Sequence, residues 1–230
     1  MKWTMDDGRW TMDDGRWTIT VPPCEARVVC CTLYVVHKRM REIVLDIETQ
    51  NIFERGNRDA SKLRISFVGI FDYATGQYEG FFEQDLPRLW QTLEQCDRLI
   101  GYNIKGFDIP VMNAHYAGDL TKLNQLDLME EVAKHTGFRL KLDDLAQATL
   151  GVGKSGSGLD AVKYYQEGQL DKLKEYCLQD VKVTKQLYEH GRMHGSVCYV
   201  DRFKNEKIVV PVNFMPTKIV KQAMNLSLGF

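Results

Sequence analysis

Ile43-Val44-Leu45-Asp46-Ile47-Glu48-Thr49 is an aliphatic run interrupted by two carboxylates, and it predicts a buried strand. Asp46 and Glu48 are two residues apart, so their side chains leave the same face of a strand. Two like charges on an apolar strand are unfavourable unless a cation compensates them. Mg²⁺ and Mn²⁺ prefer such hard oxygen ligands. From this stretch alone, an edge strand with both acids in solvent remains the alternative.

The chain from Met40 onward alternates strand and helix patterns. Three strands in a meander are followed by strand–helix units, which predicts an α/β domain: a mixed sheet with helices on its faces. We expect strands at 43–49, 63–73, 78–82, 98–102 and 125–128, and a terminal hairpin at 197–201 and 207–212. We expect helices at 86–95, 107–117, 142–150, 159–166, 170–191 and weakly 217–228, with one more ending at 135; Pro110 must fall in a first turn.

The first 39 residues differ from the remainder. A seven-residue segment, 3–9, recurs letter for letter at 10–16, and a third copy begins at Trp17. Two perfect copies are too few for a solenoid, and Asp-Asp-Gly interrupts every period of a coiled coil. We therefore expect 1–39 to be a dispensable extension, arising from an over-long start assignment. A compact domain would occupy 40–194, followed by a hairpin and tail at 195–230.

Composition excludes several classes of protein. The net charge of −1 gives no overall basic field of the kind that marks an extended nucleic-acid binder. The six cysteines form no CxxC pair or zinc-like spacing, which favours free thiols in the cytoplasm. The longest apolar run, 28–36, is about half of a membrane-spanning helix, and the preceding aspartates do not fit a signal peptide. We expect no membrane association.

A third acid opens a predicted helix. Asp108 follows the strand at 98–102. An acid in the first turn of a helix is commonly there only because it interacts favourably with the helix dipole, and that is the alternative to a functional role. Asn103 and Phe107 precede it, and they offer an amide for polar contact and a ring that could stack on a base.

The last long helix carries a tyrosine and an acid on one face. Tyr176 and Asp180 are four residues apart, and Asp180 lies within or beside the apolar stripe that includes Leu173, Cys177 and Val181. A carboxylate drawn toward the core needs a partner. A simple Tyr–Asp hydrogen bond over a packing layer is the alternative to a functional site.

Taken in order, Asp46-Ile47-Glu48-Thr49, Tyr102-Asn103 with Phe107-Asp108, and Tyr176-x-x-x-Asp180 resemble the three motifs of the DEDD superfamily of exonucleases. The resemblance covers residues 40–191 and implies a ribonuclease H-like fold. It is closest to the proofreading domain of family-B DNA polymerases and to bacterial exonuclease domains of the YprB-like type. The superfamily's other branch has a histidine where this chain has Glu175, so the tyrosine subtype is implied.

The resemblance implies a 3′–5′ exonuclease that releases nucleoside 5′-monophosphates from single-stranded ends. Two divalent cations, Mg²⁺ or Mn²⁺, would lie about 4 Å from each other and bind the scissile phosphate between them. Tyr176 would orient the attacking water, because a phenol with a pKa near 10 is a poor base at neutral pH. The implied metal ligands are Asp46, Glu48, Asp108 and Asp180, and the implied contacts to the terminal nucleotides are Thr49, Asn103 and Phe107.

Other readings stay open. A binding or adaptor module of the same fold, or an RNA-trimming enzyme, would share these motifs, because discrimination by the 2′-hydroxyl depends on groove residues elsewhere. A polymerase or helicase partner would have to be a separate chain. Gly151-Val152-Gly153-Lys154-Ser155-Gly156 ends like a phosphate-binding loop, but Ala148 replaces the required glycine, so we expect no nucleotide cofactor. A plain loop, or one in which Lys154 contacts the substrate backbone, is favoured instead.

Overall fold

The computed structural model describes residues 3–6, 9–12, 18–20, 40–153, 158–201 and 203–216. The chain divides into two compact units, Met1–Arg39 and Met40–Phe230. In the first unit, β1 (Trp3–Asp6), β2 (Arg9–Met12) and β3 (Thr18–Thr20) form an antiparallel sheet in the order β1-β2-β3. Whether this unit is dispensable stays a prediction.

The second unit is built on a five-stranded mixed sheet in the order β6-β5-β4-β7-β8. Its strands are β4 (Glu42–Thr49), β5 (Ile65–Asp72), β6 (Gln77–Phe82), β7 (Arg98–Gly101) and β8 (Gln125–Asp127). The strands β4, β5 and β6 pair antiparallel, whereas β7 runs parallel to β4 and β8 runs parallel to β7. The predicted mixed sheet is confirmed, and β4 lies at its centre rather than at an edge.

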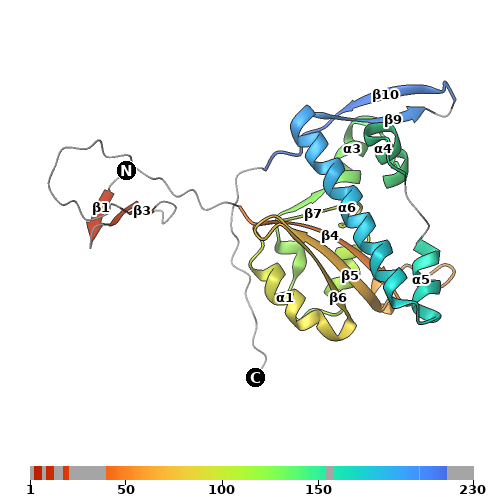
Figure 1. Ribbon diagram of the computed structural model, residues 1–230, viewed down its shortest axis with the longest axis horizontal. Coiled ribbons are helices and arrows are strands. Elements are labelled where there is room, and N and C mark those ends of the chain that lie inside the picture. Colours follow the sequence, from red (N-terminus) through yellow and green to blue (C-terminus); the bar gives the residue numbers. More distant parts are fainter. Residues whose placement is uncertain are drawn as a thin grey trace. The chain divides into compact units, whose positions relative to one another are not determined.

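Helices cover both faces of this sheet (Figure 1). They are α1 (Leu86–Glu94), α2 (Asp108–Asn113), α3 (Leu128–Thr136), α4 (Leu142–Leu150), α5 (Gly158–Gln166) and α6 (Leu170–His194), with short 3-10 turns η1 (Ala60–Lys62), η2 (Glu83–Asp85) and η3 (Leu120–Lys122). In the described part of the chain, no helix is both long and apolar enough to cross a bilayer.

The alternation of β4 divides the core into two layers. Ile43, Leu45 and Ile47 pack with the apolar faces of α1 and α2, whereas Val44 packs with α3, α4 and α6 on the opposite face. Because successive side chains of a strand point to opposite faces, Asp46 and Glu48 share the α6 face with Val44. The strand is therefore buried on both sides, and its two acids lie beneath a helix.

A C-terminal hairpin completes the α6 layer. β9 (Ser196–Asp201) and β10 (Glu206–Pro211) pair antiparallel, and Val197, Val210 and Phe214 are buried in the same cluster as Val44. The hairpin and its following segment are thus packed against the core of the motif-bearing region.

A buried ionic network ties the hairpin segment to the first strand. Glu42 on β4 accepts hydrogen bonds from the Tyr188 hydroxyl at 2.8 Å and from Arg98 at 3.2 Å. Arg98 also donates to the Phe214 carbonyl at 3.0 Å. A buried pair of charges needs such additional hydrogen bonds to offset its desolvation.

The predicted elements are recovered with small shifts. Pro110 is the third residue of α2, within its first turn as required, but α2 ends at Asn113 rather than at residue 117. The helix α6 extends to His194, where Gly195 caps it in the left-handed conformation. The helix expected at 217–228 lies outside the described residues.

We predict that Gly191→Ala destabilises the protein. A Cβ added at Gly191 on α6 would lie 2.2 Å from the Phe214 ring, and overpacking of this kind costs about 1–3 kcal/mol. At an unconstrained helical site, the same change would raise the free energy of unfolding by about 1 kcal/mol. Urea denaturation measures the sign. The exposed Glu175→Ala on the same helix is the control, with a change under about 0.5 kcal/mol. A Gly191→Ala protein as stable as the wild type would contradict the packing of Phe214 on α6.

Candidate active site

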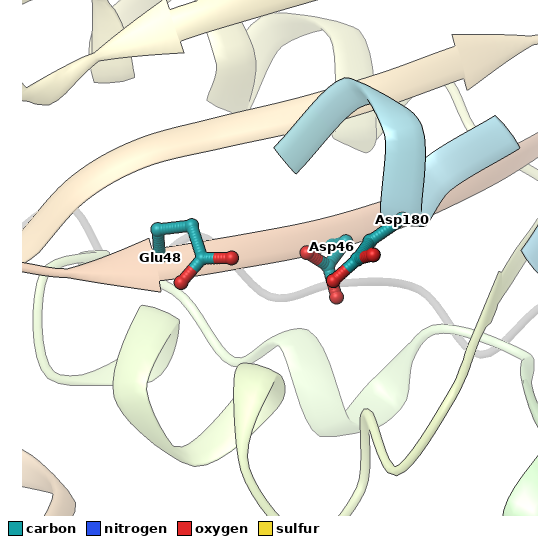
Figure 2. Close-up of side chains that lie close together, drawn as sticks. All are labelled: Asp46, Glu48 and Asp180. Carbon is teal, nitrogen blue, oxygen red and sulfur yellow. The ribbon is translucent and has the colours of Figure 1, made fainter. Parts of the chain in front are cut away.

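Asp46 and Glu48 project from one strand toward one helix (Figure 2). Glu48 is 8% exposed and Asp46 is half-buried, although both are acids. The strand is held here by antiparallel pairing to β5, in which Asp46 lies opposite Gly69 and Glu48 lies opposite Phe67. The backbone therefore fixes both carboxylates against the α6 layer.

Asp180 reaches the same point from α6. It is 5% exposed, and one ligand oxygen from each of Asp46, Glu48 and Asp180 lies within 4.8 Å of the others. We call these three residues the acidic cluster. Tyr176 lies one helical turn before Asp180 and is also buried. The expected convergence of the strand and helix motifs is thus present in the structure.

The helix approaches the sheet closely because of a glycine. A Cβ built on Gly69 would lie 3.0 Å from Cys177 Sγ and 3.0 Å from Val181 Cγ2. Cys177 Sγ lies 3.7 Å from Asp46 Oδ2, and burial together with the nearby acids raises the pKa of the thiol. Cys177 therefore remains a neutral donor beside Asp46.

Asp108 lies apart from the acidic cluster but lines the same cavity. It begins α2, it is 3% exposed, and its Oδ1 accepts a hydrogen bond from the Ile47 amide at 3.2 Å. Burial raises the pKa of Asp108 from 3.8 to about 7, and the charge of Asp127 acts in the same direction. Of the four acids implied as metal ligands, three are grouped closely and the fourth stands on the adjoining wall.

Asp127, which the sequence analysis did not single out, holds the loop that carries Asn103 and Phe107. Its Oδ1 accepts hydrogen bonds from the amides of Asn103 at 2.9 Å and Met129 at 3.1 Å, and its Oδ2 accepts one from Lys105 at 3.1 Å. The carboxylate is buried, and it also caps α3. Asp127, at the end of the neighbouring strand β8, therefore fixes the backbone of the loop that carries Asn103 and Phe107.

This loop is strained and tightly turned. Asn103 has a φ of 64°, in the left-handed region that non-glycine residues seldom adopt. A Cβ added at Gly101 would lie 2.1 Å from Ile104 Cγ2. The loop therefore packs so closely on the end of β7 that this position requires glycine. Backbone strain of this type persists only where the surroundings over-determine it, and Asp127 supplies that constraint.

A cavity of about 290 Å³ opens above the acidic cluster. All the residues that the resemblance implied line it: Asp46, Glu48, Thr49, Asn103, Phe107, Asp108, Tyr176 and Asp180. Within the described residues, Asn103 Oδ1 is buried beside Gly106 without a hydrogen-bond partner. The structure brings the predicted set together, while the role of each residue stays a prediction.

The segment after β4 adds a wall that the sequence analysis missed. Asn51, Ile52 and Phe53 line the cavity, and the Phe53 and Phe107 rings meet edge to face at 6.1 Å. Asn51 is itself held, since its side chain donates to the Lys62 carbonyl and accepts from the Arg64 amide. Nothing in the local pattern of this polar stretch distinguished it from an ordinary connection.

The acidic cluster fits a divalent cation. Three carboxylates with little solvent exposure repel one another unless a positive charge lies between them. Their oxygens are the ligands that Mg²⁺ and Mn²⁺ prefer.

In the glycine-rich segment, Gly151 caps α4 in the left-handed conformation, and Lys154 lies outside the described residues.

We predict that Asp127→Ala lowers the free energy of unfolding by about 2–4 kcal/mol, because it removes a helix cap and several charge-assisted hydrogen bonds. Amide hydrogen exchange at Asn103 and Lys105 would accelerate as well. Asp119→Ala, which removes the partly exposed cap of η3, is the matched control and would cost about 1 kcal/mol or less. Equal losses from both variants would show that Asp127 is an ordinary cap.

We also predict a pH dependence from Asp108. Its raised pKa means that the folded state binds the proton more tightly than the unfolded state, so this residue lowers stability as the pH rises from about 4 to about 7. In EDTA, Asp108→Asn would therefore gain stability over the wild type across that range and keep a constant advantage above it. Urea denaturation at about pH 5, 6, 7 and 8 measures the difference, and a pH-independent difference would contradict the shift.

Comparisons with known proteins agree with this architecture. A family model described as the RNase_H superfamily matches residues 43–191, which is more than half of the chain. The family B DNA polymerase from the hyperthermophilic archaeon Pyrobaculum calidifontis has a similar structure, with a TM-score of 0.53 and 21% sequence identity. That match covers 66% of this chain and 24% of the polymerase chain, and it supports the fold alone. A search of the curated proteins found no match.

The family match includes β4 with Asp46 and Glu48, the loop and helix that carry Asp108, and α6 through Asp180. The mixed sheet flanked by helices, with β4 at its centre, is the corresponding α/β architecture. This chain belongs to the RNase H superfamily.

Proposed function

We propose that the protein is a metal-dependent 3′–5′ exonuclease that acts on single-stranded nucleic acid ends. The observation that carries this proposal is the convergence of Asp46, Glu48 and Asp180 to within 4.8 Å at the base of a cavity that Asp108 and Tyr176 also line. Superfamily membership supports nuclease chemistry in general. We propose in addition that the protein degrades its substrate in the 3′–5′ direction and that it requires a free end.

The acidic cluster and Asp108 would hold two divalent cations, Mg²⁺ or Mn²⁺. Bound there, such cations supply Lewis acidity toward a phosphate and lower the pKa of a bound water. Asp46 and Glu48 contribute ligands from a rigid central strand and Asp180 from a long helix, so little reorganisation accompanies binding. Asp108 faces the same space with its position fixed by the Ile47 amide.

Tyr176 orients the attacking water by hydrogen bonding. A phenol can donate a hydrogen bond to a water, but it is a poor general base at neutral pH. Its position one turn before Asp180 places the phenol on the cavity wall. Asn103 and Phe107, together with Thr49, would contact the terminal nucleotide.

The size and surroundings of the cavity favour a chain end. A volume of about 290 Å³ is at the small end of ligand pockets, which suits one nucleotide rather than a duplex. The Phe53 and Phe107 rings form an aromatic wall on which a base can stack. A separate polymerase or helicase would supply such ends in the cell, and both DNA and RNA remain within the proposal.

The proposal predicts mononucleotide release from 5′-labelled, single-stranded DNA or RNA oligonucleotides in Mg²⁺ or Mn²⁺, and none in EDTA. A blocked 3′ end would abolish release. Asp180→Asn would lower the rate by about a hundredfold or more, since it removes a carboxylate that would hold the cations that act at the reacting phosphate. Product analysis by gel and chromatography measures this.

Asp171→Asn is the matched control, because it makes the same acid-to-amide change at an exposed position of α6. Its rate would stay within about twofold of the wild type. Internal cuts in circular or 3′-blocked substrates would contradict the exonuclease proposal and show that the protein is an endonuclease. Oligonucleotide binding with no cleavage in any metal would favour the adaptor reading.

A further inference from the structure

A second hollow, of about 420 Å³, lies between the loop that precedes α4 and the tip of the β9–β10 hairpin. Figure 1 shows this hairpin beside α3 and α4, at the opposite end of α6 from α5. The hollow adjoins the acidic cavity through one wall: Tyr102, which lines the cavity, donates a hydrogen bond from its hydroxyl to the carbonyl of Leu140, which lines the hollow, at 2.8 Å.

The hollow is lined by aromatic side chains that face solvent. Phe138 is 49% exposed, and its ring meets Tyr199 edge to face at 5.8 Å. Phe203, at the turn of the hairpin, is fully exposed. Nucleic acid bases stack on such rings regardless of sequence, because every base presents a π face.

The charge at the rim complements a phosphate backbone. Arg139 and Lys141 flank Leu140, and both are exposed. Two acids also line the hollow, but the Asp201 carboxylate is occupied within the turn, where it accepts hydrogen bonds from the Phe203 amide at 2.8 Å and the Lys204 amide at 3.2 Å. Asp144 is partly buried in the first turn of α4. The more exposed charges are therefore basic.

We propose that this hollow, which we call the hairpin hollow, binds the single strand that precedes the terminal nucleotide. This inference rests on the proposed function, since the 3′ end of the strand would occupy the cavity above the acidic cluster. The Tyr102–Leu140 contact separates that cavity from the hairpin hollow. An apolar protein segment would use Phe138 and Phe203 but would leave Arg139 and Lys141 without counterparts. A nucleic acid strand uses both kinds of side chain.

Binding is measured by fluorescence anisotropy of labelled oligothymidylates in EDTA, with the full chain. Phe138→Ala and Phe203→Ala would each weaken binding by about five- to fiftyfold, as expected for the loss of one base–aromatic stack. Arg139→Ala and Lys141→Ala would each also lower the slope of log K against log salt by about 0.7, the value for one phosphate contact on a single strand. The phenylalanine variants would leave that slope unchanged.

Length gives a second readout. The effect of Phe203→Ala would appear in a ladder of oligothymidylates only above a few nucleotides, within the roughly 4–16 that one single-strand-binding fold covers. Hydrolysis of the p-nitrophenyl ester of thymidine 5′-monophosphate, which requires only the acidic cavity, would stay within about twofold. Val209→Ala, an exposed apolar truncation elsewhere on β10, and Lys122→Ala on η3 are the matched controls.

The outcomes separate the two proposals. If the wild type does not hydrolyse the ester but the hairpin variants lose oligonucleotide binding, the nuclease proposal fails and the binding surface stands. If the wild type hydrolyses the ester and all four variants bind the longest oligonucleotide as tightly as the wild type does, the binding surface is overturned. The exposed aromatic residues would then suit a protein partner instead.

Discussion

The close contact between α6 and the central sheet at Gly69 is the constraint on which the site depends. Gly69 lies opposite Asp46 in the β4–β5 pair, and a Cβ there would touch Cys177 and Val181 at 3.0 Å. The missing side chain lets the helix lie against the strand at this one point. Because Asp180 is three residues from Cys177, the same contact brings its carboxylate to Asp46 and Glu48. A Cβ at position 69 would require the Cys177 and Val181 side chains to give by a few tenths of an ångström, and a larger side chain would press further against α6.

This arrangement places charge where packing alone would place hydrocarbon. On the α6 face of β4 only Val44 is apolar: Glu42 is paired with Arg98 and Arg192, whereas Asp46 and Glu48 belong to the acidic cluster. Asp108 adds a further acid to the same cavity, and burial raises its pKa to about 7. Such a set is unfavourable for folding without a counter-charge, which is the sense in which functional sites cost stability. A bound cation would convert that cost into affinity.

Two pairs of site residues could be predicted because their signals are local, whereas the meeting of the pairs and the inclusion of Asp108 were implied by the family resemblance. The spacing of Asp46 and Glu48 on a strand, and of Tyr176 and Asp180 on a helix, follows from the periods of the two structures. Two features could not be predicted. Asp127 reads as an ordinary residue at a strand end, and only the parallel pairing of β7 with β8 brings it to the Asn103 loop. The position of Asp108 beside the acidic cluster involves a hydrogen bond from the Ile47 amide, which is 61 residues away in sequence.

The hairpin shows why motif boundaries and packing boundaries differ. The family match ends at residue 191, but Val197, Val210 and Phe214 lie in the same buried cluster as Val44. Arg98 and Tyr188 both donate to Glu42 at the start of the central strand, and Arg98 also donates to the Phe214 carbonyl. The base of the hairpin is therefore fixed to the strand that carries the acids. The exposed tip extends from this fixed base, so a strand bound at the tip would be positioned relative to the acidic cluster through the base of the hairpin.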